Sequence, residues 1–189
     1  MASEPKFCTL GDLRVHGREA CEHFVDAHYA DLFRWLHWLT SDRDGAADLT
    51  QATFLSFWES IDAGKSSTEA RTWLFSIGRN VWRNACRQRR KAGRASGKTI
   101  RDGDQTEGAR EVSPVDRAEA VERATAIREA VVELPFDLRE AITLRYWQYR
   151  PYNEIAEILG ITPELARQRV FQARDRLRRR LRAWAPSTP

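Results

Sequence analysis

The chain has 189 residues, a length that allows one domain or two small ones. Its 31 Lys and Arg residues against 27 Asp and Glu give a net charge of only +4, but the basic residues concentrate at 83–101 and 167–182, and such local blocks favour a nucleic-acid partner. No apolar run approaches the ~18 residues of a membrane helix, and the N-terminus lacks the features of a signal peptide, so we expect a cytoplasmic protein without membrane insertion.

The N-terminal part of the chain predicts a loose extension followed by a helix. Residues 1–20 show only weak periodicity. A regular apolar stripe then predicts a helix over 21–40, formed by Val25, Tyr29, Leu32, Phe33, Leu36 and Leu39. Ser41 and Asp42 supply a stop signal and a cap for the next helix.

A second helix is predicted over 44–61. Its apolar stripe consists of Ala47, Phe54, Phe57, Trp58 and Ile61. Asp48 and Gln51 fall off this stripe, so we expect their side chains to be exposed.

The cysteine and histidine residues predict neither a disulfide framework nor a metal site. An odd set of cysteines without a C-x-x-C pair is typical of reduced thiols in a cytosolic protein: Cys8, Cys21 and Cys86. No zinc-ligand spacing that we can justify matches His16, Cys21, His23 and His28. We therefore expect no metal and no other cofactor.

A third helix is predicted to begin after the capping-box pattern of Ser66 and Glu69 and to end in the basic run at 87–91. Its inward stripe is formed by Trp73, Leu74, Ile77, Val81 and Ala85. Its opposite side carries Arg71, Arg79, Asn80, Arg83, Asn84 and Arg87. That opposite side is either a solvated helix face or a surface for nucleic acid, where Asn contacts base edges and Arg contacts phosphate.

The middle of the chain, at 93–114, is rich in Gly, Ser and charge, which predicts a flexible linker unless a partner orders it. Helical periodicity resumes at Val115. One predicted helix ends before Pro135, and the next follows directly.

The segment 152–182 predicts two helices joined by a tight turn. Gly160 is suited to end the first helix in a left-handed conformation. Thr162 can cap the second helix, and Pro163 suits its first position. A short helix, a Gly-containing turn and a second helix are typical of a DNA-binding helix-turn-helix.

The second of these helices has two different faces. Its inward stripe consists of Ala166, Val170, Ala173, Leu177 and Leu181. The other side carries Arg167, Gln168, Phe171, Gln172 and Arg174, and Arg and Gln can pair with base edges in a major groove. Arg169 is nearer the core stripe and is also compatible with a structural ion pair. A helical hairpin with a solvated basic face remains the alternative.

These patterns contain no strand signal and predict an all-α fold. We expect two small helical domains, at 21–92 and 115–184, joined by the linker at 93–114 and followed by a tail at 185–189. Each domain has only ~70 residues, so each core should be small. A linker of this kind leaves the angle between the domains open.

Two motif blocks give the chain a family resemblance. The first contains DLxQxxFLxxW from Asp48 and WLxxIxRN from Trp73, and the second contains LPxxxREAxxLRY from Leu134 followed by the helix-turn-helix. Together these blocks resemble regions 2 and 4 of a bacterial extracytoplasmic-function (ECF) sigma factor of the sigma-70 family. The resemblance covers about three quarters of the chain and implies a subunit that binds core RNA polymerase and directs it to promoters.

The resemblance also implies roles for individual residues. The beta-prime clamp of polymerase would contact Asp48, Leu49, Gln51 and Phe54, although periodicity favours a core position for Phe54. The minus-ten promoter element, including a flipped base at the 62–70 loop, would contact Lys65, Ser66, Arg71, Arg79, Asn80, Arg83, Asn84 and Arg87. The minus-thirty-five element would contact Thr162, Arg167, Gln168, Phe171, Gln172 and Arg174. Further implied partners are the beta flap and a possible anti-sigma factor.

Several positions depart from the family pattern and leave the promoter sequence open. Ala52 stands where the family has an acidic residue, Pro151 where it has Ser, and Glu164 near the start of the recognition helix would repel phosphate. The chain offers no nucleophile–base pair or phosphate-binding Gly loop, so we expect no enzymatic activity. Two alternatives remain: a helix-turn-helix regulator that acts without polymerase, and a sigma-like decoy that acts by binding another protein.

Overall fold

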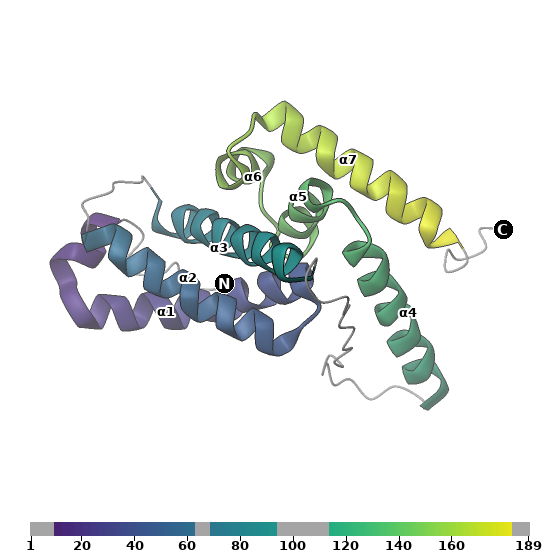
Figure 1. Cartoon of the computed structure of the whole chain (residues 1–189), viewed down its shortest axis with the longest axis horizontal. Coiled ribbons are helices and arrows are strands. Elements are labelled where there is room, and N and C mark those ends of the chain that lie inside the picture. Colours follow the sequence, from purple (N-terminus) through teal and green to yellow (C-terminus); the bar gives the residue numbers. More distant parts are fainter. Residues whose placement is uncertain (1–9, 63–68, 94–113, 183–189) are drawn as a thin grey trace.

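The computed structural model describes residues 10–62, 69–93 and 114–182. Within these ranges the chain is helical and has no strand (Figure 1). The helices are α1 (Leu10–Thr40), α2 (Arg43–Asp62), α3 (Ala70–Gly93), α4 (Pro114–Val132), α5 (Phe136–Tyr146), α6 (Tyr152–Leu159) and α7 (Pro163–Arg180). None of them is long and apolar enough to cross a membrane.

Helix α1 begins earlier than the sequence pattern predicts. It begins at Leu10, within the segment where we expected a loose extension up to residue 20. Gly11 and Gly17 interrupt the pattern there, and Gly has a low helix propensity. The next part of the helix is firmly held, because Ala20 and Phe24 are buried.

The first three helices pack into a bundle (Figure 1). The predicted stop after α1 is confirmed, because Asp42 caps α2 by accepting a hydrogen bond from the Gly45 amide at 3.0 Å. In the core, Phe24 of α1 stacks on Phe57 of α2 with ring centroids 5.0 Å apart. Gly78 of α3 lets the helices approach closely, since a Cβ there would lie 3.1 Å from Leu32.

The C-terminal helices confirm the predicted helix-turn-helix. Gly160 ends α6 in the left-handed conformation, with φ 60° and ψ 44°. Thr162 then accepts a hydrogen bond from the Leu165 amide at 3.3 Å, and Pro163 follows it as the first residue of α7. Ala166, Val170 and Ala173 are buried and hold α7 against α5 and α6, as their spacing predicts.

The two halves of the chain pack directly against each other. Helix α5 lies against α1, and α6 lies against α3. The Trp35 indole donates a hydrogen bond to Thr143 at 3.1 Å, and Arg139 donates to the Leu39 carbonyl at 2.8 Å. The buried hydrophobic residues of both halves form one contiguous cluster rather than two separate cores. Most of the predicted linker, residues 94–113, lies outside the described residues.

Candidate nucleic-acid interface

Helix α2 presents a mixed polar and apolar face to solvent. Asp48 and Gln51 are exposed, as their place off the apolar stripe predicts. Leu55 is 64% exposed and follows Gln51 by one helical turn, so an apolar side chain extends the same face. Leu49 and Phe54 are buried beneath this face. Sequence reasoning missed Leu55. It follows Asp48 by seven residues, which is the spacing that places two side chains on the same face of a helix.

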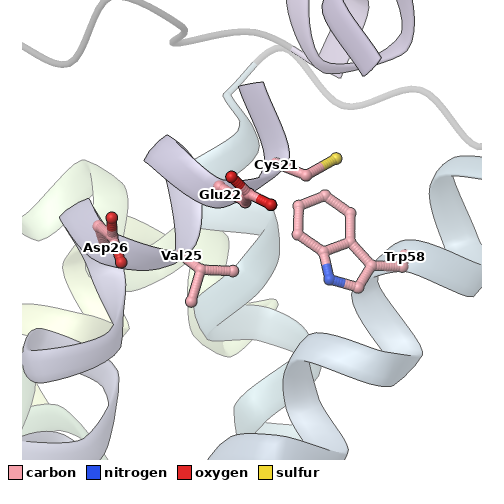
Figure 2. A pocket seen from close by; sticks show the side chains of 5 residues that line it. All are labelled: Cys21, Glu22, Val25, Asp26 and Trp58. Carbon is pink, nitrogen blue, oxygen red and sulfur yellow. The ribbon is translucent and has the colours of Figure 1, made fainter. Parts of the chain in front are cut away.

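A shallow pocket of about 530 Å³ lies between α1 and α2 (Figure 2). Val25 and Trp58 line it with apolar surface, and Glu22 and Asp26 add two carboxylates from α1. Cys21 lies beside the Trp58 ring. In the described part of the chain, no His, Cys, Asp and Glu side chains are grouped so that they could hold a metal ion.

The basic side of α3 is divided between exposed and paired residues. Asn80, Asn84 and Arg87 are exposed. Arg71 instead pairs with Asp31 of α1 at 2.9 Å. Lys65 and Ser66, which the resemblance places at the minus-ten element, lie outside the described residues.

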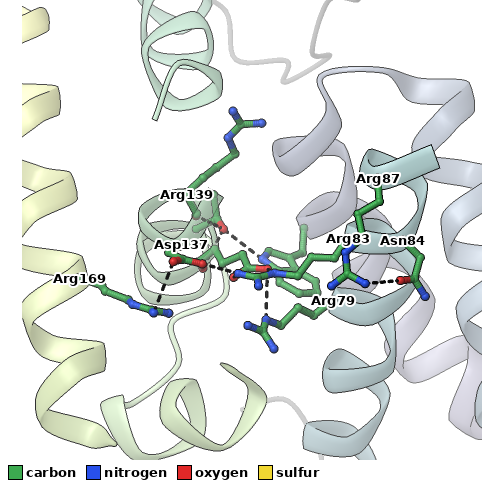
Figure 3. A network of polar contacts seen from close by, with 10 residues as sticks. Arg79, Arg83, Asn84, Arg87, Asp137, Arg139 and Arg169 are labelled. Atoms are coloured by element: carbon green, nitrogen blue, oxygen red, sulfur yellow. Dashed lines mark hydrogen bonds and ion pairs between the residues drawn. The ribbon is translucent and has the colours of Figure 1, made fainter. Parts of the chain in front are cut away.

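Two further arginines of α3 point into the other half of the molecule (Figure 3). Arg83 binds the Glu140 carboxylate through both Nε and Nη2, each at 2.7 Å, and Arg79 Nε lies 3.2 Å from the same carboxylate. Arg83 also pairs with Asp137. The hydrogen bond to Glu140 raises the pKa of Arg83 above its usual value. Local periodicity cannot find these pairs, because the partners are more than 50 positions apart in the chain.

On α7, the side opposite the buried stripe is exposed. It carries Arg167, Gln168, Phe171, Gln172 and Arg174. Phe171 is 62% exposed, and the Arg174 guanidinium lies over its ring at 5.8 Å. Arg167 similarly lies over the Tyr152 ring at 5.3 Å. These rings support two long cationic side chains in an extended row on one helix face.

Several other polar residues, at the turn and along α7, have structural partners. The Thr162 hydroxyl caps α7. Arg169 pairs with Asp137 at 3.5 Å, which confirms the structural ion pair that its place near the core stripe allows. At the end of α7, Arg180 pairs with Glu133 at 3.0 Å and Arg179 with Asp175 at 2.7 Å. The basic tail of α7 is therefore partly neutralised within its own half of the molecule.

Comparison with known families finds two matches in chain order. Residues 24–92 match the model of Sigma-70 region 2, and residues 124–177 match the model of Sigma-70, region 4. The first match contains α2 and α3, and the second contains α5 and the helix-turn-helix.

Curated relatives are similar over most of the chain. The ECF RNA polymerase sigma factor SigC of Mycobacterium tuberculosis is 32% identical over 171 residues, which are 89% of this chain and 86% of SigC. The ECF RNA polymerase sigma factor SigM of Bacillus subtilis is 32% identical over 148 residues, covering 78% of this chain and 86% of SigM.

Solved structures extend the similarity to the arrangement of the helices. The sigma factor RpoE, in complex with the anti-sigma factor NepR from Bartonella quintana, superposes with a TM-score of 0.69 at 26% identity. That match covers 85% of this chain and 96% of RpoE. CnrH in complex with the cytosolic domain of CnrY has the same fold, with a TM-score of 0.68 at 22% identity, over 92% of this chain and 95% of CnrH.

Proposed function

The chain belongs to the sigma-70 family of RNA polymerase sigma factors, in its extracytoplasmic-function group, and on that premise we propose which of its surfaces binds which partner. As a sigma factor it binds core RNA polymerase and directs the enzyme to promoters. Sigma factors are non-enzymatic initiation factors, so the polymerase supplies the chemistry. We place its action in the cytoplasm, where core polymerase and promoter DNA are found together.

We propose that the exposed face of α2 binds core polymerase. Asp48 and Gln51 offer a carboxylate and an amide, and Leu55 offers an apolar side chain between polar neighbours. Protein–protein interfaces combine apolar and polar side chains in this way. Leu49 and Phe54 are buried beneath this face, so we assign them the role of holding α2 in place for the beta-prime clamp.

The exposed row on α7 is our surface for the minus-thirty-five element, and it is the observation that best supports promoter recognition. Arg167 has the donors that pair with guanine, and Gln168 and Gln172 have the amides that pair with adenine. Phe171 offers apolar contact for a thymine methyl group. Arg174 lies at the end of the row, where we assign it a phosphate contact.

The exposed part of α3 is our surface for the minus-ten element. Asn80 and Asn84 are one turn apart and both exposed, so their amides can contact two neighbouring bases. Arg87 is exposed one turn further and adds a positive charge for phosphate. We assign Arg79 and Arg83 to the same DNA strand, although both are paired with carboxylates of α5 in this structure.

Two additional partners complete the proposal. We assign the beta flap of polymerase to the C-terminal half, and an anti-sigma factor as a possible regulator. The similar RpoE and CnrH chains were solved as complexes, one with an anti-sigma factor and the other with the cytosolic domain of CnrY.

Binding to core polymerase tests the α2 assignment. The double variant Asp48→Ala/Gln51→Ala should bind core polymerase at least about tenfold more weakly, since two side chains that each contribute about 1 kcal/mol together exceed the roughly 1.4 kcal/mol of a tenfold change. The matched control is Asp26→Ala/Gln88→Ala, which removes one carboxylate from α1 and one amide from α3 at exposed positions outside the proposed polymerase-binding surfaces.

Circular dichroism of both variants should show unchanged helicity, because all four side chains lie outside the buried core. Equal affinity of the α2 variant and the Asp26→Ala/Gln88→Ala control for core polymerase would refute the α2 assignment. If the parent chain itself failed to bind core polymerase, a DNA-binding regulator that acts alone would replace the sigma-factor function.

A further inference from the structure

Two arginines that we assign to promoter DNA already form ion pairs within the molecule. Arg79 and Arg83 of α3 both bind the Glu140 carboxylate of α5, at 3.2 Å and 2.7 Å (Figure 3). Asp137 lies one turn before Glu140 and also pairs with Arg83. We call these four residues the α3–α5 ion cluster.

The cluster depends on closure of the two halves. Glu140 has no exposed surface, and a fully buried Glu is rare unless it is paired. Its partners Arg79 and Arg83 both come from α3, in the other half of the chain. Separating the halves would therefore leave this carboxylate and both guanidinium groups without their partners. A guanidinium that holds a carboxylate through two parallel hydrogen bonds cannot offer those donors to a DNA phosphate.

Closure is supported by contacts on both sides of the cluster. The Gln148 amide donates to the Asp31 carbonyl at 3.0 Å, in addition to the bonds that Trp35 and Arg139 make across the same boundary. Trp82 of α3 packs edge to face on Phe136 of α5 at 5.2 Å. Aromatic packing and buried hydrogen bonds define one specific orientation of the halves.

The closed arrangement leaves two of the three proposed surfaces exposed, on α2 and on α7. Asp48, Gln51 and Leu55 remain exposed on α2, and Arg167 and Phe171 remain exposed on α7. Only the minus-ten surface loses part of its positive charge to the other half. Polymerase can therefore contact α2 while the α3 arginines are still held.

We propose that Asp137 and Glu140 act as an internal substitute for DNA phosphate, so that the free chain masks part of its minus-ten surface. This inference rests on the proposed function of α3. DNA then binds α3 in competition with α5, and the apparent affinity is the intrinsic affinity multiplied by the fraction of molecules that are open. Polymerase relieves the masking if it binds the separated halves more tightly than the closed ones.

A matched pair of charge reversals tests the proposal in the full chain. Asp137→Lys places a third cation against Arg83 and Arg169, and the side chain of Asp137 is 51% exposed. The control Glu133→Lys makes the same charge change at a side chain that is 54% exposed and pairs with Arg180 in its own half. Glu140→Gln is a second variant that keeps the shape of the side chain and removes its charge.

The parent chain and each variant are compared by two measurements, of molecular size and of DNA binding. Small-angle X-ray scattering should give the parent and Glu133→Lys the dimensions of a compact chain, with a radius of gyration of about 16 Å for a globule of this length. Asp137→Lys and Glu140→Gln should be larger. Fluorescence anisotropy with a labelled single-stranded DNA oligonucleotide should show at least about fivefold tighter binding by both opened variants than by Glu133→Lys.

The controls distinguish a failure of the masking proposal from a failure of the assignment of α3 to DNA. Circular dichroism should show equal helicity for all variants, and the exposed position of Asp137 keeps the test valid if Glu140→Gln does not fold. Equal DNA affinity of Asp137→Lys and Glu133→Lys would overturn the masking. Arg83→Ala added to Asp137→Lys should weaken DNA binding; no loss there would instead refute our assignment of Arg83 to DNA.

Discussion

Phe171 offers the sharpest test of how α7 recognises the upstream promoter element. It is the large apolar side chain of the exposed row, and 62% of it is accessible. The C5-methyl group of thymine is the only apolar group on a base edge in the major groove. We expect Phe171 to contact one thymine methyl group, so replacing that thymine by deoxyuridine should weaken binding while every hydrogen bond of the base pair is kept.

The expected magnitude follows from the area of one methyl group. Burying one carbon of this kind contributes about 0.8 kcal/mol, which corresponds to roughly a fourfold change in the dissociation constant. The Arg174 guanidinium lies over the ring, 5.8 Å from its centroid. We expect this contact to be the same in the free and the DNA-bound chain, so the contribution of the methyl group should appear in the affinity.

The assay measures binding of the polymerase holoenzyme to promoter duplexes in which each thymine of the upstream element is replaced in turn by deoxyuridine. One position should show the fourfold loss with the parent chain and none with Phe171→Ala. Val121→Ala, which shortens an apolar side chain on α4 that is 48% exposed, is the control and should behave as the parent. A thymine preference that persisted unchanged in Phe171→Ala would refute the contact.

Three further predictions concern single residues. Arg167→Ala should cost about 1–3 kcal/mol at one upstream base position, measured by holoenzyme binding to single-base promoter variants; a uniform loss over all positions would make Arg167 a phosphate contact. Tyr149 is 84% exposed and has φ 52°, so Tyr149→Gly should relieve about 1 kcal/mol of strain and raise Tm by about 2–4 °C in calorimetry, whereas a lower Tm would refute the strain. Burial, and then Arg71, lowers the pKa of His28 from 6.5 to about 4. Because the unfolded chain binds this proton below pH 6.5 and the folded chain only below about pH 4, the free energy of unfolding should fall by about 3 kcal/mol as pH falls through that window. Urea titrations should show a smaller decrease for His28→Leu, and an equal decrease would contradict the assignment.

Local signals in the sequence were sufficient to predict the helix-turn-helix. Gly160 and Thr162 specify how one helix ends and the next begins, and both adopt the predicted conformations. The spacing of Ala166, Val170 and Ala173 identifies the buried side of α7 and therefore the exposed row on the opposite side. These features depend on residues a few positions apart, which is the range over which helical periodicity carries information.

Such local signals could not predict the contacts between the two halves of the chain. The predicted inward stripe of α3 includes Leu74 but omits Phe75 and Trp82, which are also buried. Periodicity assigns one apolar side to a helix, whereas α3 packs against its own bundle and against the C-terminal half. For the same reason Arg79 and Arg83 were predicted either as DNA contacts or as part of a solvated helix face, because nothing near them in the chain indicates Glu140.

The central claim is that this chain directs polymerase through two separate promoter elements, and transcription with purified components tests it most directly. Core polymerase, the chain and a promoter library randomised at both elements would be combined, and the transcripts sequenced. We predict transcripts that begin downstream of one shared two-block motif, with the upstream block altered by Arg167→Ala and the downstream block by Asn80→Ala. Transcripts that share no motif, or no transcripts at all from a chain that binds core polymerase, would contradict the account.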